Sequence, residues 1–444
     1  MFVPVQLSTV RRKYPNLETS LVPERLFRFE NAHRIKFIGT ILCLEVAPLL
    51  FLPIPRMNVE PTNDSILQHF QERIEDFLAL LKFLVEHESP SNHKLLVGAF
   101  VTEYRSLLEE VGFHCEEISG PAGPQLFAEK RGAHETASPL VLVGHSDTVW
   151  PAGEVERRPP RIKDGKMYGP GIYDMRGGLV LIIAALRFLH HEGRELPCRL
   201  QVFLSADEER GSVTAKPQME HLLSSKATAL VVEPPTPDGG LKAERKGVCI
   251  YDLKLIGREA HAGAEPEKGA SAIHELARQI VAIEKFADSA CGITVNVGQV
   301  QGGMATNVVA ASARAGIDVR FERSSDGEKI DRKFRSLVSQ TPGVQLRLHG
   351  GIVFPPLELT PRNRQLCDVA LQVAKEMGLQ MRLGKTGGGS DGCFLSACGL
   401  GVLDGLGMEG GGAHAHDEHI VIDRLPVRAA FLTRLILTLT EIGK

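Results

Sequence analysis

The 444-residue sequence lacks several features that would place it in a specialised class of protein. Its eight cysteines are scattered and form no Cys-x-x-Cys pair, which excludes the usual spacing of a structural cysteine–zinc site or a dithiol redox motif. Lys and Arg number 51 and Asp and Glu 54, so the net charge of -3 provides no global field for nucleic acid or an anionic membrane. There is no long internal repeat or low-complexity tract. With 43% hydrophobic and 24% charged residues, the composition is that of a globular chain of two or three domains.

The N-terminal region lacks a recognisable secretory signal, because its first 36 residues are mixed in character. A cytoplasmic protein is therefore expected. Residues 37–54 are apolar apart from Glu45 and follow a basic stretch, so an N-terminal membrane anchor or export segment is the alternative. Glu45, Pro48 and Pro53 disfavour a membrane-spanning helix. We expect residues 1–63 to form a poorly ordered N-terminal extension.

Three apolar runs predict the centre of an α/β fold. Residues 139–144, 199–205 and 228–232 are largely apolar and of strand length, as is typical of a sheet covered on both faces. Between the first two, residues 176–190 have helical spacing, so the order predicts a mostly parallel sheet with helices on both faces. Helices are also expected over residues 64–88, 93–111, 361–377 and 425–442, a further strand over 400–404, and a turn-rich stretch up to Ser138.

A different pattern interrupts this fold. Strands are predicted at 247–257, 292–300, 313–322 and 344–349, with helices at 269–286 and 327–338. The order β-α-β-β-α-β is that of a ferredoxin-like unit. We therefore predict a catalytic domain made of residues 64–244 and 352–444, with an inserted ferredoxin-like domain at 245–351.

Metal-ligand residue types follow the predicted strands. In open α/β sheets, ligands bind at the carboxyl ends of the strands, so these side chains are expected to meet at one edge. Singly, each has an ordinary structural explanation: Asp174 suits a helix N-cap, and Glu208 and Glu209 an exposed charge pair. Together they indicate a site. The residues are His145 and Asp147, Glu208 and Glu209, Glu233, Asp174 in the loop before the helix, and His414 and His416 after the last strand.

The donor types favour zinc. Two imidazoles and three carboxylates suit this borderline-soft ion, and two zincs with a bridging hydroxide would balance the charge of Asp174, Glu209 and Glu233. Asp147 is expected to orient His145 through its second ring nitrogen, and Glu208 to act as general base. Because His416 lies close to His414, the choice between these two ligands stays open.

Five ordered motifs resemble a known family. They are Gly144–Val149, Gly171–Gly178, Asp207–Ser212, Val232–Pro234 and His414–Glu418. They resemble the dinuclear zinc family of glutamate carboxypeptidase, acetylornithine deacetylase, succinyl-diaminopimelate desuccinylase and aminoacylase, and are most like glutamate carboxypeptidase. The resemblance implies two zinc ions per chain, or another divalent metal such as cobalt or manganese. It places His145 and Glu233 on one ion, Glu209 and His414 on the other, Asp174 between them, and Glu208 as general base and acid.

The insertion resembles this family's dimerisation lid, which implies a homodimer formed through residues 245–351. By that resemblance His261 stabilises the oxyanion, while Asn307 and Arg320 hold the substrate carboxylate. Gly388 and Gly389, ahead of a predicted helix, are expected to add backbone donors for the same anion. From the residues alone, His261 as a turn cap and Arg320 as a surface charge remain open.

The function predicted is zinc-dependent hydrolysis of an amide bond next to a free carboxylate, by metal-bound hydroxide. N-acyl amino acids or short peptides are the expected substrates, and carboxypeptidase and deacylase activity are both open. A serine hydrolase is the first rival, because Gly388–Gly392 fits the motif G-x-S-x-G around Ser390, with Asp404 and His414 following. The second is a binding relative without catalysis, which would be expected to lack Glu208.

Overall fold

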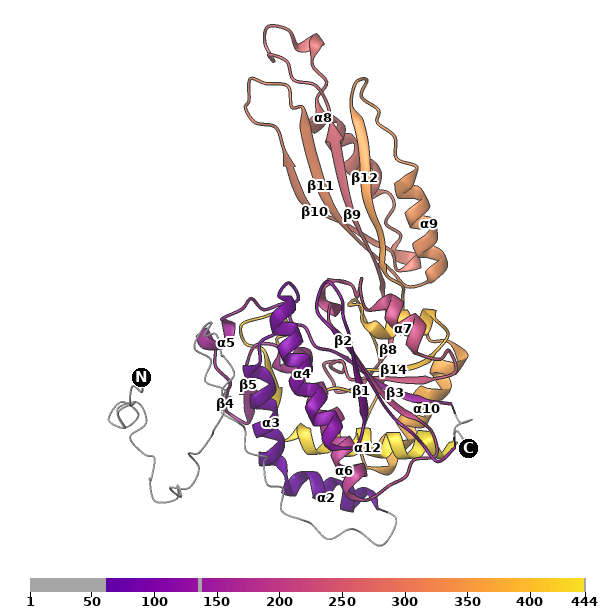
Figure 1. Cartoon of the computed structure of the whole chain (residues 1–444). Helices are drawn as coiled ribbons and strands as arrows, with labels where there is room; N and C mark the ends of the chain where they lie inside the picture. The colour runs from indigo at the N-terminus through magenta and orange to yellow at the C-terminus, as the bar shows by residue number, and fades with distance from the viewer. Residues whose placement is uncertain (1–60, 135–137, 443–444) are drawn as a thin grey trace, which may run out of the picture. The chain divides into compact units, whose positions relative to one another are not determined.

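A computed structural model describes residues 61–134 and 138–442 and shows a mixed α/β fold around a six-stranded sheet (Figure 1). The strand order is β1-β2-β6-β3-β7-β14. Strands β6, β3, β7 and β14 are parallel, whereas β1 and β2 run antiparallel at one edge. The strands are β1 (His114–Ile118), β2 (Gln125–Lys130), β3 (Leu140–His145), β6 (Leu200–Ser205), β7 (Thr228–Val231) and β14 (Gly401–Asp404).

Both faces of this sheet are buried. Leu140 and Leu142 of β3 belong to one apolar cluster, and Val141 and Val143 to another on the opposite face. This explains why the central strands appear in the sequence as largely apolar runs and do not alternate between apolar and polar residues. One cluster includes α2 (Asn63–Glu72), α3 (Ile74–Glu86), α4 (Lys94–Glu110), α6 (Gly177–His191), α10 (Pro361–Glu376) and α12 (Arg424–Ile442); the other includes α7 (Lys216–Leu222) and α11 (Asp391–Ala397).

The three central strands confirm the prediction from the apolar runs, and they are neighbours in the sheet. Two details differ. The helix expected over residues 64–88 is divided into α2 and α3, because Arg73 has non-helical backbone angles of φ -112° and ψ 17°. The turn-rich stretch before Ser138 contains β1 and β2, and the exposed and half-buried residues of β1 leave no apolar run there to detect.

The insertion forms its own antiparallel sheet with strand order β10-β11-β9-β12. Both α8 and α9 pack on one face, where they bury Tyr251 and Leu253. The alternate residue Ile250 is 51% exposed, so the opposite face is uncovered. Strand β12 pairs with β9 as far as Phe354, beyond the predicted boundary at residue 351. The elements are β9 (Gly247–Ile256), α8 (Ala272–Glu284), β10 (Thr294–Gly302), β11 (Ser312–Phe321), α9 (Ser324–Arg335) and β12 (Gln345–Phe354).

Two small sheets complete the described chain. Strand β8 (Leu241–Arg245) pairs with β13 (Leu383–Thr386). The other sheet has the order β15-β16-β5-β4, and its pairing of β16 with β5 brings the loop at 412–418 beside the loop before α6. Its members, with the helix before them, are α5 (Glu154–Arg157), β4 (Arg161–Lys163), β5 (Lys166–Tyr168), β15 (Gly410–Gly411) and β16 (His419–Val421).

The membrane anchor predicted at residues 37–54 lies outside the described residues, as do residues 1–60 of the extension predicted for residues 1–63. Helix α2 begins at Asn63, within that predicted extension. Among the helices of residues 61–134 and 138–442, none combines the length and apolar character needed to cross a membrane.

Candidate active site

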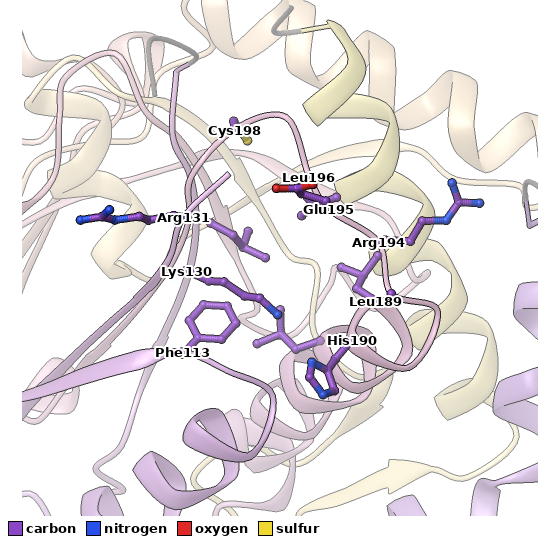
Figure 2. A pocket seen from close by; sticks show the side chains of 12 residues that line it. Phe113, Lys130, Arg131, Leu189, His190, Arg194, Glu195, Leu196 and Cys198 are labelled. Carbon is purple, nitrogen blue, oxygen red and sulfur yellow. The ribbon is translucent and has the colours of Figure 1, made fainter. Parts of the chain in front are cut away.

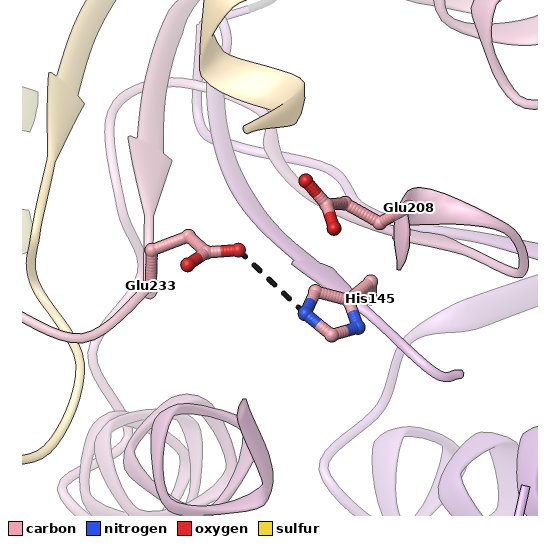
Figure 3. A group of neighbouring side chains, drawn as sticks. All are labelled: His145, Glu208 and Glu233. Atoms are coloured by element: carbon pink, nitrogen blue, oxygen red, sulfur yellow. Dashed lines mark ion pairs between the residues drawn. The ribbon is translucent and has the colours of Figure 1, made fainter. Parts of the chain in front are cut away.

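The carboxyl ends of three adjacent strands carry the first candidate ligands. His145 is the last residue of β3, and Glu208 lies in a 3₁₀ turn (Glu208–Arg210) shortly after β6. Glu233 follows β7 by two residues. Because the strand order is β6-β3-β7, the three side chains converge on one point, as Figure 3 shows.

Two loops supply the remaining candidates. Asp174 lies in the turn Ile172–Arg176, which precedes α6. This turn begins after Gly171, whose φ is +71°. Gly178 allows α6 to approach β7 closely, because a Cβ there would lie 2.1 Å from the carbonyl oxygen of Val232. His414, in the loop between β15 and β16, adopts the left-handed region with φ 60°.

Asp174 lies between two histidines and presents a different oxygen to each. Its Oδ1 is 3.1 Å from His145 Nε2, and its Oδ2 is 3.4 Å from His414 Nε2. His145 Nε2 is also 3.6 Å from Glu233 Oε1, and His414 Nε2 is 3.2 Å from Glu209 Oε2. The five residues therefore form two groups that share one carboxylate. His414 is thus the histidine that faces the carboxylates, whereas the ring of His416 lies 5.8 Å from that of Trp150.

Burial and hydrogen bonds shift the pKa values of these groups. Burial raises the pKa of Glu208 well above its usual range, and the neighbouring Glu233 adds to the effect. Burial likewise raises the pKa of Glu233 to about 7, with Asp174 acting in the same direction. Hydrogen bonds to Asp174 and Glu209 raise the pKa of His414 to about 10. Metal binding by His414 would therefore release a proton.

The donor set fits a divalent metal centre. At zinc bond lengths of about 2.0–2.1 Å, neighbouring tetrahedral ligand atoms lie about 3.3 Å apart, and the four separations here range from 3.1 to 3.6 Å. Within the described residues, the Oε1 atom of Glu209 is buried without a hydrogen-bond partner. Distance alone also groups His145 with Glu208 and Glu233, and separately with Asp174 and Glu209, so proximity does not distinguish a ligand from a base at Glu208.

Comparison with known proteins identifies the family. Residues 141–438 match the model of peptidase family M20/M25/M40, which is more than half of the chain. The chain belongs to this family. The M20/M25/M40 match includes the inserted β9–β12 segment as well as every candidate ligand.

The relatives of this M20/M25/M40 peptidase that are described next are at most 29% identical to it. Carboxypeptidase G2 of Pseudomonas sp. (strain RS-16) is 28% identical over 305 residues, which cover 68% of this chain and 74% of the relative. Succinyl-diaminopimelate desuccinylase of Methylococcus capsulatus is 29% identical over 326 residues, or 68% of this chain and 84% of the relative. The solved YXEP protein of Bacillus subtilis, described as a dinuclear metal binding peptidase, shares the fold with a TM-score of 0.62 and 16% identity, covering 84% of this chain and 99% of that one.

Asp147 faces the second ring nitrogen of His145, as expected, and also supports a neighbouring turn. Its carboxylate Oδ1 is 3.4 Å from His145 Nδ1, but its own carbonyl oxygen is closer to that nitrogen, at 3.0 Å. The fully buried carboxylate also accepts hydrogen bonds from the backbone N–H groups of Glu208 at 3.1 Å and Glu209 at 3.3 Å. Asp147 therefore holds the turn that carries two candidate residues of the M20/M25/M40 peptidase.

Glu418 is a supporting residue that reasoning from the sequence missed. Its buried carboxylate accepts hydrogen bonds from the backbone N–H groups of Gly171, Tyr173 and Asp174, and from Trp150 Nε1, at 2.8 to 3.0 Å. These bonds hold the turn that presents Asp174. In the sequence, only its place within the motif His414–Glu418 indicates that Glu418 belongs to the site. The backbone groups that it contacts are determined by the pairing of β16 with β5.

Arg245 is a second supporting residue that was missed. Its guanidinium forms two hydrogen bonds with Asp404, at 2.7 and 2.9 Å, and lies 3.6 Å from Glu233 Oε2. It also donates to the carbonyl oxygens of Gly388 and Gly389. This buried cation therefore joins the loop containing Gly388 and Gly389 to the candidate ligand Glu233.

The candidate residues of the insertion make their contacts away from the metal ligands. His261 is exposed, and its Nδ1 accepts hydrogen bonds from the N–H groups of Gly263 and Ala264. The carbonyl oxygen of Asn307 accepts from Ala262 N at 3.0 Å. Arg320 donates to Asp318 and, through Nη1, to the carbonyl oxygen of Gly387 at 2.9 Å. Arg320 thus contacts the 387–389 loop.

The environment of Ser390 is structural. Its hydroxyl is fully buried and donates to Asp404 Oδ2 at 2.6 Å while it accepts from Gly392 N at the start of α11. Asp404 is in turn paired with Arg245, and the Nε2 of His414 faces Asp174 and Glu209. Ser390, Asp404 and His414 are therefore not arranged as a nucleophile, orienter and base.

Proposed function

We propose that this M20/M25/M40 peptidase is a dinuclear zinc hydrolase that cleaves an amide bond next to a free carboxylate. The observation that carries the proposal is the position of Asp174, whose two oxygens face separate histidines, each beside a further carboxylate. His145 and Glu233 would hold one ion, Glu209 and His414 the other, with Asp174 shared. When bound, the ions lower the pKa of a water molecule and polarise the scissile carbonyl.

Glu208 is proposed as the general base and acid. It would take the proton of the attacking water and return it to the leaving amine. Its buried position and raised pKa support this role, because proton transfer is most efficient when the pKa of the group lies near the working pH. Asp147 would position the group by holding the N–H of Glu208.

Substrate recognition is proposed to use the insertion and the 387–389 loop. Arg320 and Asn307 would bind the free carboxylate, and the N–H groups of Gly388 and Gly389 would add donors, while His261 would stabilise the developing oxyanion. The contact of Arg320 with Gly387 supports a shared carboxylate site, because both groups then lie at one loop. A guanidinium is suited to this task, since it can exchange its bond to Asp318 for a bidentate bond to substrate.

The insertion is further proposed to be a ferredoxin-like dimerisation lid. Its element order, with strand order β10-β11-β9-β12, supports this assignment. Strand β10 lies at an edge of that sheet, where its backbone groups can pair with a second copy. Sedimentation velocity of the chain with and without residues 246–354, a deletion that keeps Arg245, tests the dimer.

Metal content and turnover test the site. Elemental mass spectrometry after zinc loading and dialysis should give two equivalents per chain, and fewer in His145→Ala and Glu209→Ala. Glu208→Ala should keep both metals and lose about 10²- to 10⁴-fold in turnover. Folded protein that retains no metal would refute the site, and near wild-type turnover of Glu208→Ala would refute the base.

The names of the relatives support two substrate classes. Carboxypeptidase G2 favours release of a C-terminal amino acid, whereas succinyl-diaminopimelate desuccinylase favours removal of an acyl group. Pairs of substrates that share a leaving amino acid, one peptidyl and one N-succinyl, distinguish these activities by their kcat/KM. The carboxypeptidase proposal, which we prefer, requires the peptidyl member to be the better substrate.

A further inference from the structure

A cavity of about 350 Å³, shown in Figure 2, lies between the end of α6 and the start of β6. Its lining includes Leu200, the first residue of β6, and Leu189 near the carboxyl end of α6. The candidate active site lies at the other ends of the same two elements. A six-residue strand and a 15-residue helix each span about 20 Å. The cavity is therefore a separate site.

The inner wall of the cavity is apolar. Phe113, Leu186, Cys198 and Leu200 line it and are each at most 5% exposed. The volume is within the range of small-molecule sites, which begins at about 300 Å³. An occupant therefore needs an apolar part to contact this wall.

The charged residues of the lining are three cations and one carboxylate, namely Lys130, Arg131, Arg194 and Glu195. Figure 2 shows the Lys130 side chain extending into the space beside Phe113, whereas the guanidinium groups of Arg131 and Arg194 point to opposite sides. Lys130 Nζ donates to the carbonyl oxygen of Val111 at 2.9 Å. That acceptor is neutral, and within residues 61–134 and 138–442 no carboxylate oxygen lies within ion-pair distance of Lys130 Nζ.

We propose that this cavity binds a small monocarboxylate with an unbranched apolar tail. The carboxylate pairs with Lys130, and the tail contacts the wall formed by Phe113, Leu186 and Leu200. A charge-assisted hydrogen bond at the inward-pointing ammonium supplies selectivity for the anion, and apolar burial supplies the remaining affinity. The proposal is independent of the reaction at the metal ligands.

Octanoate is the probe for this site. Calorimetric titration of the full-length, metal-loaded chain should show saturable binding, and octanamide should bind at least about ten-fold more weakly because it lacks the charge. Octanoate should also slow alkylation of Cys198, measured by peptide mass mapping, while exposed Cys291 in the same sample serves as the internal control. Binding at the metal centre would not protect Cys198.

Substitutions locate the bound carboxylate. Lys130→Met keeps the aliphatic stem and should weaken octanoate binding at least about ten-fold, whereas Lys130→Arg should retain binding. Lys163→Met, at an exposed position on β4, is the matched control and should bind as the parent does. The proposal is overturned if octanoate fails to protect Cys198, if octanamide binds equally well, or if Lys130→Met that is folded by circular dichroism binds normally.

Discussion

The carboxylate of Glu418 accepts a 3.0 Å hydrogen bond from the backbone N–H of Asp174, although the two residues are 244 positions apart in the sequence. The same carboxylate binds three further donors around this turn. Asp174 therefore presents its two oxygens to His145 and His414 from a turn whose backbone is fixed by a buried anion. The position of the shared candidate ligand depends on this contact.

Glu418→Gln should weaken metal binding by about 10- to 100-fold, because supporting residues of metal ligands contribute on this scale. The amide keeps the shape of the side chain but places an NH₂ group against backbone donors that need an acceptor. Zinc affinity measured by competition with a chelator gives the result. Glu117→Gln, which alters a surface pair with Arg105, is the control and should bind zinc normally. Equal affinities in the two variants would contradict the positioning role.

Asp147→Asn should reduce turnover more than it reduces metal content. The carboxylate accepts from the N–H groups of both Glu208 and Glu209, and the amide can serve only one of them without a donor–donor clash. The proposed base is then misplaced, and a shift of about 1 Å at a catalytic group can cost about 100-fold in rate. Single-turnover kinetics on zinc-loaded protein measure the effect. A variant that keeps the parental rate would contradict the positioning role of Asp147.

Much of the site was predictable because its parts depend on local sequence. Largely apolar runs identify β3, β6 and β7, and the ends of parallel neighbours must meet, so the sequence alone predicts that His145, Glu208 and Glu233 lie together. The contacts of Glu418 and Arg245 could not be predicted. They depend on which distant strands pair, as β16 does with β5, and no short-range pattern encodes that choice.

Two features of the backbone could not be predicted from the sequence either. The carboxylate of Asp147 lies 3.4 Å from the ring of His145, as expected, but its hydrogen bonds with the N–H groups of Glu208 and Glu209 were not predicted. They form because the end of β6 lies beside β3. The break between α2 and α3 at Arg73 has no proline or glycine to mark it. In both cases the sequence pattern is compatible with more than one geometry, and tertiary packing selects one.

Arg320→Ala should raise the KM for carboxylate substrates with little change in kcat. The guanidinium contacts Asp318 and Gly387, so its proposed role is to bind the substrate and not to take part in bond cleavage. Loss of a charged hydrogen bond costs about 1.5–3 kcal/mol, which corresponds to an increase in KM of about 10- to 150-fold. Steady-state kinetics with a substrate and its amidated analogue test this. An unchanged KM for the carboxylate would remove Arg320 from the substrate site.

Ser390→Ala should leave turnover per metal-loaded molecule within a few-fold of the parent. The hydroxyl caps α11 and bonds to Asp404, so its loss should lower the free energy of unfolding by about 1–2 kcal/mol. Urea denaturation measures the change in stability, and turnover divided by the amount of bound metal measures the change in activity. A serine hydrolase would instead lose about 10³-fold or more in turnover at unchanged stability, so that result would restore Ser390 as a nucleophile.

His69 should make the fold less stable in mild acid. Its ring packs against Phe70 and Phe188, and burial, assisted by Arg73, lowers its pKa from 6.5 to about 4. Between these values the unfolded chain binds a proton that the folded chain does not, so stability falls as the pH decreases from 6.5 toward 4. His69→Gln removes this contribution and should lose less stability than the parent across the same interval. Urea midpoints, measured with a chelator present throughout so that metal loss does not contribute, give the comparison. His114→Gln, at an exposed position on β1, should follow the parent, and a parallel pH dependence of His69→Gln and the parent would show that His69 is solvated.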